Sequence, residues 1–180
     1  MIDLVRFDSK ELTRFAERFS VTPLVFEGEG VLKCGSITLL DGRASSNKRL
    51  PSHIAKTTPD LVFGCEWKGE KDHMDYPQHA LRIQTARALC DASCIYVMTP
   101  RILEHYEIAR FNTRVLRTAD VPIVFASLAE REDELASPKD LQAIGTLLGL
   151  SDREIRRGRD LLEKLPTMRF DQRFELESPR

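Results

Sequence analysis

The sequence predicts an α/β domain built on a largely parallel sheet, and three observations support this. Short apolar runs alternate with amphipathic helical stretches along much of the 180 residues, as in strands joined by crossover helices. The chain is long enough to bury one sizeable core. Its hydrophobic content of 42% and charged content of 31% are typical of globular proteins. The sheet could be open and doubly wound, or closed into a barrel.

The first half of the chain is predicted to contain a strand, a helix and further short strands. Residues Ile2 to Arg6 form an apolar run typical of a strand, and Asp8 to Glu11 form a capping box that begins an amphipathic helix ending near Phe19. Three more apolar runs follow at Pro23 to Phe26, Val31 to Cys34 and Ile37 to Leu40. The last two could be two strands or one bent strand. Residues 41–47 have the composition of a loop, and residues 48–56 could form a short, broken helix.

The second half alternates more clearly between strands and helices. Strands are predicted at residues 60–65, 93–98 and 122–126, because each run is short, apolar and bounded by turn residues. Helices are predicted at residues 77–91, 99–117 (in one or two pieces), 138–148 and 152–165. Thr99, Ser137 and Ser151 precede three of these helices and are suitable N-cap residues. Residues 67–76 form a polar, charged loop by composition.

We expect a single domain over residues 1–166 and a C-terminal tail over residues 167–180. Apolar residues alternate along this tail at Met168, Phe170, Phe174 and Leu176. The pattern fits a loose end, a late edge strand or a strand that docks onto a partner.

Charge and composition narrow the class of protein. The net charge of −1 argues against a surface wholly dedicated to nucleic acid, although a local basic patch is compatible with it. No apolar run is long enough to cross a membrane, and the first residues lack a signal-peptide pattern, so we expect a cytoplasmic protein. The four cysteines form no Cys-x-x-Cys pair and are expected to be reduced core thiols; they are Cys34, Cys65, Cys90 and Cys94.

A row of arginines is the most specific chemical signal in the sequence. Arg110, Arg114 and Arg117 are spaced four and three residues apart, so on a helix they share one face. Guanidinium groups on such a face are suited to phosphate binding. The alternative is a solvated face whose arginines pair with nearby acids such as Glu104 or Glu107.

Four short motifs surround and follow this row in a characteristic order. They are Asn112-x-Arg114-x-x-Arg117, Val121-Pro122-Ile123, Ser137-Pro138-x-Asp140-Leu141 and Leu148-Gly149-Leu150-Ser151. Their order and spacing resemble the ribonuclease P protein component 3 family, the thirty-kilodalton-type subunit of archaeal and eukaryotic ribonuclease P. The resemblance covers roughly residues 60–165, and residues 27–58 carry no part of it.

The resemblance implies a TIM-barrel-like α/β fold, either complete or lacking one β/α unit. It also implies a non-catalytic subunit that binds the RNase P RNA, pairs with the component 2 protein and supports removal of the 5′ leader from precursor tRNA. In that family the RNA is the catalyst and holds the Mg²⁺, so no cofactor is expected on this chain. Arg114 and Arg117 match basic positions of the family motif.

We therefore predict that Arg114 and Arg117 bind RNA, with Arg110 next. Lys68 and Lys71, in the loop after the predicted strand at 60–65, are weaker candidates, because acidic residues interleave with them. A basic cluster on the last predicted helix, Arg153 to Arg159, is accompanied by acids, and pairing within the helix accounts for it.

Two alternative functions remain open from the sequence. A metal-dependent phosphoesterase on a related barrel would need several ligands at strand ends, and the available residues are Asp3, His53, Glu66, His73, Asp75, His79 and His105. No His-x-His follows the first predicted strand, where that type of enzyme places its first ligands. The second alternative is a degenerate relative that has lost its RNA surface and serves as an interaction module.

Overall fold

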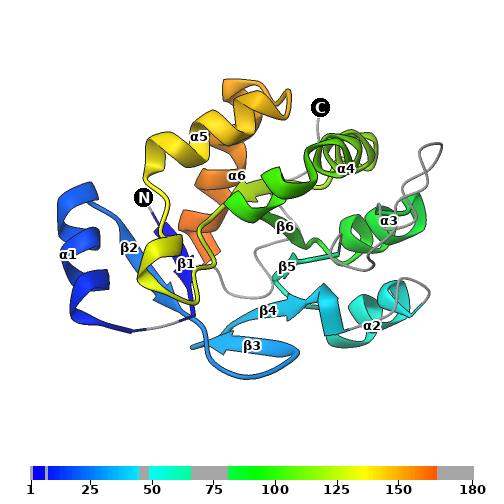
Figure 1. Cartoon of the computed structure of the whole chain (residues 1–180). Helices are drawn as coiled ribbons and strands as arrows, with labels where there is room; N and C mark the ends of the chain where they lie inside the picture. The colour runs from blue at the N-terminus through cyan, green and yellow to red at the C-terminus, as the bar shows by residue number, and fades with distance from the viewer. Residues whose placement is uncertain (1, 7, 45–48, 66–80, 166–180) are drawn as a thin grey trace.

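The computed structural model describes residues 2–6, 8–44, 49–65 and 81–165. Strands lie at the centre of the molecule and helices lie around them (Figure 1). The α/β class predicted from the sequence is confirmed. Within the described residues, no helix combines the length and apolar character needed to span a membrane.

The strands form two hydrogen-bonded sheets. The smaller one pairs β1 (Ile2–Val5) with β2 (Thr22–Val25) in parallel. The larger sheet has five strands in sequence order, namely β3 (Val31–Cys34), β4 (Ile37–Asp41), β5 (Leu61–Phe63), β6 (Ile95–Met98) and β7 (Ile123–Phe125). Its pairs are parallel except for β3 and β4, which form an antiparallel hairpin. Gly35 turns this hairpin with a φ of 59°, a conformation that glycine adopts without strain, so the apolar runs are two strands.

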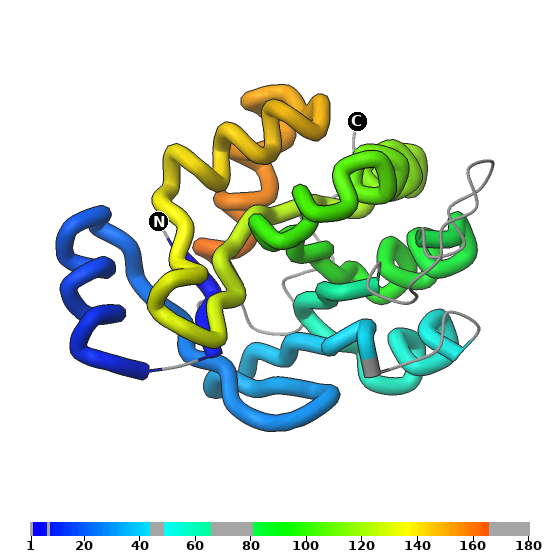
Figure 2. The backbone as a smooth tube through the Cα atoms, viewed as in Figure 1, coloured from blue at the N-terminus to red at the C-terminus, as the bar shows by residue number. Residues whose placement is uncertain are grey.

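Single bridges join the two sheets at both edges. Val5 pairs in parallel with Ala129, beyond β7, and Glu27, beyond β2, pairs in antiparallel with Lys33 of β3. The N–H of Arg6 donates to the carbonyl of Ala129 at 2.8 Å. Figure 2 shows the blue N-terminal strand beside the yellow-green segment after β7. The described strands therefore form two sheets in contact, and the barrel part of the prediction is not confirmed, because no continuous ladder closes the ring.

In the described residues, six α-helices connect and cover the strands. They are α1 (Lys10–Phe19), α2 (Leu50–Thr57), α3 (Ile83–Asp91), α4 (Tyr106–Thr118), α5 (Pro138–Leu147) and α6 (Asp152–Lys164). Short 3₁₀ helices occur at Gly42–Ala44, Pro100–His105 and Glu132–Glu134. The ambiguous segment near residue 50 is helical because Pro51 lies in the first turn, where its missing N–H costs nothing. The start of the helix predicted from residue 77, the loop 67–76 and the tail 167–180 lie outside the described residues.

Helix caps follow the sequence with two corrections. Thr99 stands at the N-cap position of the 3₁₀ helix Pro100–His105, but its side chain makes no cap hydrogen bond. The N-cap of α1 is Ser9 and not Asp8, because the Ser9 hydroxyl accepts the N–H of Leu12 at 3.1 Å. The predicted box at Ser151 is confirmed, with the Glu154 side chain returning to the N–H of Ser151 at 2.8 Å. An equivalent box joins Ser137 and Asp140 at the start of α5.

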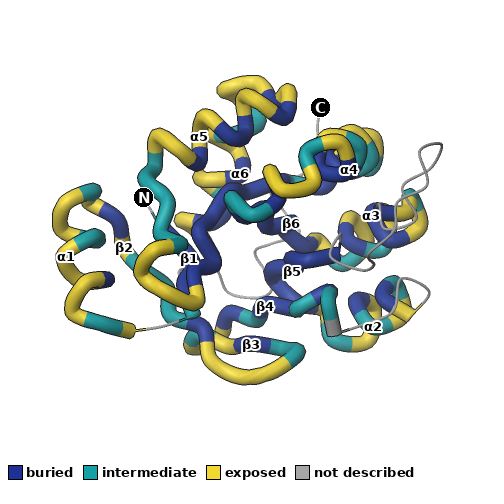
Figure 3. Tube along the Cα trace, viewed as in Figure 1, coloured by how far each residue is buried: buried dark blue, intermediate teal, exposed yellow. Residues whose placement is uncertain are grey.

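The core has two layers because side chains alternate along the strands. On β5, Leu61 and Phe63 point into a cluster that also contains Leu4 and Leu162, whereas Val62 joins a cluster packed against helices α2 to α5. Figure 3 shows burial along the central strands and exposure on the outer helix faces. Cys65 and Cys94 are buried, as expected of core thiols, and burial raises the pKa of Cys94 to about 12. Cys34 is partly buried. Cys90 is exposed, so the prediction was wrong for that thiol.

Candidate nucleic-acid interface

Helix α4 carries the predicted arginine row on its outer face. Its inner face is formed by buried residues, which are Ile108, Ala109, Asn112, Thr113 and Leu116. Arg110, Arg114 and Arg117 are all exposed, as the spacing predicted. The structure therefore brings the three residues onto one solvent-facing surface, which we call the α4 arginine row.

Asn112, the first residue of the arginine motif, has a structural role. It is completely buried, and its side-chain oxygen accepts the N–H of Leu81 at 2.7 Å. This contact ties α4 to the segment that precedes α3. Asn112 therefore helps to fix the orientation of the helix that displays the arginines.

The three arginines differ in their partners. Arg117 forms an ion pair with Glu154 of α6, with Nε and Oε1 2.7 Å apart, and half of its side chain is exposed. Arg110 and Arg114 have no acidic partner within ion-pair distance among the described residues. Neither Glu104 nor Glu107, the acids considered from the sequence, pairs with the row in the described part of the chain. Arg110 and Arg114 are thus the members of the row whose charge is least compensated.

Glu154 explains why Arg117 is engaged. One of its carboxylate oxygens accepts hydrogen bonds from the hydroxyl and the N–H of Ser151 and so caps α6. The other oxygen forms the ion pair with Arg117. Burial alone would raise the pKa of Glu154, but the contacts with Ser151 and Arg117 outweigh it and hold the pKa below its ordinary value. Nearby, Arg157 of α6 pairs with Asp120 at 2.9 Å. These two ion pairs hold α6 against the end of α4.

We expect Glu154→Gln to lower the free energy of unfolding at pH 7 by about 1 kcal/mol, through loss of a partly exposed ion pair and weakening of a helix cap. Because the folded-state pKa is depressed, this contribution is present above the unfolded value near 4.5 and is lost as the pH falls through the lower folded value. Urea denaturation at pH 7 and pH 3 measures it. Glu107→Gln on the exposed side of α4 is the control. An equal deficit at both pH values would contradict the prediction.

The other predicted site residues are only partly placed. Lys68 and Lys71 lie outside the described residues, as do Glu66, His73, Asp75 and His79 of the metal-ligand set. Within the described ranges, no three His, Cys, Asp or Glu side chains come together as a metal site. Asp3 lies buried in β1, while His53 belongs to α2 and His105 ends a 3₁₀ helix. The phosphoesterase alternative is therefore untested for the ligands that lie outside the described residues, and the described ligands form no cluster.

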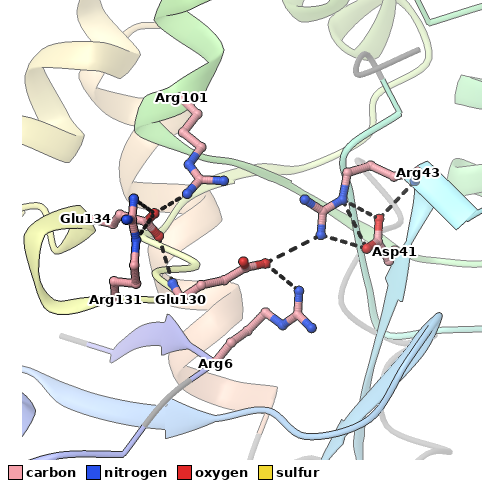
Figure 4. A network of polar contacts seen from close by, with 7 residues as sticks. All are labelled: Arg6, Asp41, Arg43, Arg101, Glu130, Arg131 and Glu134. Atoms are coloured by element: carbon pink, nitrogen blue, oxygen red, sulfur yellow. Dashed lines mark hydrogen bonds and ion pairs between the residues drawn. The ribbon is translucent and has the colours of Figure 1, made fainter.

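A second charged site, which the sequence analysis missed, lies at the carboxyl ends of the strands. We call it the strand-end network, and Figure 4 shows its members, Arg6, Asp41, Arg43, Arg101, Glu130, Arg131 and Glu134. They follow or end β1, β4, β6 and β7. This is the edge of a parallel α/β sheet where ligands usually bind.

Glu130 links the two sheets within the strand-end network. Its carboxylate lies 2.6 Å from Nη1 of Arg6, after β1, and 3.7 Å from Nη2 of Arg43, after β4. Asp41 also holds Arg43, because its carboxylate oxygens accept hydrogen bonds from Nε and Nη2 of Arg43 at 2.7 to 3.0 Å. The Arg43 guanidinium lies over the Phe63 ring, 5.0 Å from the ring centre. The hydrogen bond from Arg43 to Asp41 raises the pKa of the guanidinium, which stays charged.

Glu134 forms the other half of the network. Its carboxylate forms ion pairs with Arg101 and Arg131, and it accepts a hydrogen bond from the N–H of Glu130 at 2.8 Å. Burial would raise its pKa, but these donors outweigh burial and lower it. Every arginine of the network thus faces a carboxylate. The arrangement fastens the strand ends together, and its capacity to attract a further anion is smaller than that of the α4 arginine row.

The fold and its surfaces define a mixed α/β protein with a cationic helix face. No family model matches the chain, and comparison with curated proteins gives no match. Among solved structures, the chain is similar to a chain of a cryo-EM structure of archaeal ribonuclease P with mature tRNA. The similarity covers 91% of this chain and 89% of that chain, with a TM-score of 0.51 and 15% sequence identity. At this identity the similarity shows the fold alone.

Proposed function

We propose that this chain is a non-catalytic protein subunit of ribonuclease P, of the component 3 type. It binds the RNase P RNA and supports removal of the 5′ leader from precursor tRNA. The observation that carries the proposal is the fold similarity, over nine-tenths of the chain, to a chain of archaeal ribonuclease P with mature tRNA. The order of the four sequence motifs supports it independently. In this proposal the two contacting sheets are a barrel of the TIM type with incomplete closure.

The α4 arginine row is the RNA surface in this proposal. Arg110 and Arg114 supply charge that no described acid compensates, and Arg117 becomes available when RNA phosphates compete with Glu154. Lys68 and Lys71 are further RNA-binding residues in this proposal. The component 2 protein is the partner subunit, and the Mg²⁺ belongs to the RNA, which performs the hydrolysis.

Reconstitution tests the proposal directly. Precursor tRNA cleavage is measured with RNase P RNA and the component 2 protein, with and without this chain, at low and high Mg²⁺. We expect the chain to increase cleavage most at low Mg²⁺, where protein cations substitute for metal in neutralising phosphates. Unchanged cleavage at both Mg²⁺ concentrations would reject the assignment.

The double variant Arg110→Gln/Arg114→Gln is expected to weaken binding to RNase P RNA about tenfold at low salt. It should also reduce the slope of log K against log salt by roughly 1.5 to 2 units, because two phosphate contacts are lost. Electrophoretic mobility shift across a salt series measures both quantities. Both side chains are exposed, so the fold should be unaffected.

Arg18→Gln is the matched control for this variant. Arg18 is an exposed arginine on α1, which lies on the opposite side of the molecule from α4 in Figure 1. Its loss should leave the affinity and the salt slope unchanged. If Arg18→Gln lowers binding as much as the double variant does, the RNA contact is non-specific and does not belong to the α4 arginine row.

A further inference from the structure

A cavity of about 320 Å³ lies beneath helices α5 and α6, at the seam between the two sheets. Its lining includes Ile2 from β1 together with Val124 and Phe125 from β7. These strands are joined by a single bridge further along, at Val5 and Ala129, so no ladder fills the space between them at this level. We call this space the seam cavity.

The floor of the seam cavity is apolar. Leu141 of α5 and Ile155 and Leu162 of α6 complete it around the Phe125 ring. The Phe125 residue as a whole is 8% exposed. A flat apolar group that entered the cavity would lie against this ring and the aliphatic side chains, and burial of its faces would favour binding.

The rim of the seam cavity is cationic. Lys139, Arg156 and Arg159 line it and are exposed, against one lining acid, Asp152. Arg159 lies 3.9 Å from its neighbour Asp160, whereas Lys139 and Arg156 have no ion pair among the described residues. The rim therefore carries an excess of positive charge that its own acids do not compensate.

Gln142 adds a hydrogen-bonding group to the rim. It is exposed, it lines the cavity, and within the described ranges its side-chain amide has no hydrogen bond. An amide offers both donors and an acceptor. The seam cavity thus combines an aromatic floor, a free amide and guanidinium groups at its mouth.

We propose that the seam cavity binds an unpaired nucleotide of a single-stranded RNA segment, with the base on the Phe125 floor and the flanking phosphates on Arg156 and Arg159. Single-stranded RNA is recognised by base stacking on aromatic rings, hydrogen bonds to base edges and cationic contacts to phosphates. This inference rests on the proposed RNA-binding function and assigns it a second surface. The cavity lies under α5 and α6, and so differs from the α4 arginine row.

Fluorescence anisotropy of a labelled single-stranded RNA decamer with the full chain tests the proposal. We expect Arg156→Gln/Arg159→Gln to weaken binding about tenfold and to reduce the salt slope by roughly 1.4 units, since each contact to a single strand contributes about 0.7. Gln142→Ala, which removes the amide from an exposed mouth position, should weaken binding with little change of charge or fold. Arg153→Gln, exposed on α6 but not lining the cavity, is the matched control and should have no effect.

Competition experiments distinguish the ligand class. Adenosine or uridine monophosphate should displace the decamer at concentrations at which inorganic phosphate does not. Displacement by phosphate alone to the same extent would overturn the nucleotide assignment. Decamer binding that is unchanged in both cavity variants would also overturn the assignment. The same holds if those variants leave decamer binding unchanged and abolish association with a protein subunit instead.

The outcome is separable from that of the proposed function. Decamer binding that depends on Arg156 and Gln142, together with unchanged precursor tRNA cleavage in the reconstitution, would support the cavity and reject the ribonuclease P role. Stimulated cleavage, together with decamer binding that the cavity variants do not change, would support the ribonuclease P role and reject the cavity as a nucleotide site.

Discussion

Replacing Gly158 by alanine is expected to destabilise the protein by about 3 kcal/mol, because a Cβ atom there makes the shortest contact found for any glycine that the structure describes. Gly158 is buried in the middle of α6, where the helix crosses β7. A Cβ atom there would lie 1.9 Å from the carbonyl oxygen of Ile123 and 2.9 Å from its carbonyl carbon. Both are backbone atoms, so no side-chain rotation can relieve the clash.

The size of the effect follows from opposing contributions. Alanine in a helix interior is intrinsically favoured over glycine by about 1 kcal/mol. The net loss of stability means that the cost of the clash exceeds this gain. The clash forces α6 away from β7 and loosens the packing of Leu162. It also loosens the contacts that Glu154 and Arg157 make with α4 and Asp120. For a chain of this length, 3 kcal/mol corresponds to a fall of roughly 10 °C in Tm.

Gly145→Ala is the matched control, because Gly145 is also a buried glycine inside a helix. Its added Cβ would meet the Ile155 Cδ1 at 2.9 Å and the Phe125 Cε2 at 3.0 Å. These are the ends of side chains that can move by a few tenths of an ångström, so a cost of about 1 kcal/mol is expected. Differential scanning calorimetry compares the two variants. Equal melting temperatures would show that α6 can lift from β7 freely, contrary to the prediction.

Local features of this fold were predictable from the sequence because they depend on neighbouring residues. The Ser151 box and the exposed arginine face of α4 follow from spacings of three and four residues, which the structure confirms. The exposure of Cys90 was missed for a local reason. Leu89 occupies the buried side of α3, and the next residue is turned by about 100° toward solvent.

The charged contacts could not be predicted because they join distant segments. Arg117 and Glu154 lie in different helices, and the strand-end network draws on four strand ends. One signal was available: Arg6 is the last residue of the first predicted strand, and Arg43 lies in the loop after the predicted strand that ends at Leu40, where parallel sheets gather polar groups. The contact between the two sheets could not be predicted from the sequence. β1 and the segment after β7 are joined by one bridge, and a single bridge leaves no alternating apolar pattern in the sequence.

Asp3→Asn is expected to stabilise the protein at pH 7 and to flatten its pH dependence. Asp3 is 1% exposed in β1, and its Oδ1 accepts the N–H of Leu4 at 2.9 Å and that of Ser127 at 2.7 Å. Its Oδ2 is buried without a hydrogen-bond partner. Burial raises the pKa of this carboxyl, and the hydrogen bonds from Ser127 and Leu4 offset the increase only in part. An asparagine oxygen keeps both accepted bonds and removes the buried charge.

The sign of the pH effect follows from the direction of this shift. Between the unfolded pKa near 3.8 and the raised folded value, the folded state binds more protons at Asp3, so stability falls as the pH rises through that window, by about 1.4 kcal/mol for each unit of the increase. The increase in the free energy of unfolding caused by Asp3→Asn should therefore be absent below this pH window and complete above it. The cost of an amide N–H without a partner reduces this increase. Urea denaturation from pH 3 to pH 8 measures the difference, with Asp91→Asn at an exposed position as the control. If Asp3→Asn were less stable than the parent at pH 7 while keeping the parent's pH slope, the carboxylate would be held in its charged form by the fold, and the join between the two sheets would depend on that charge.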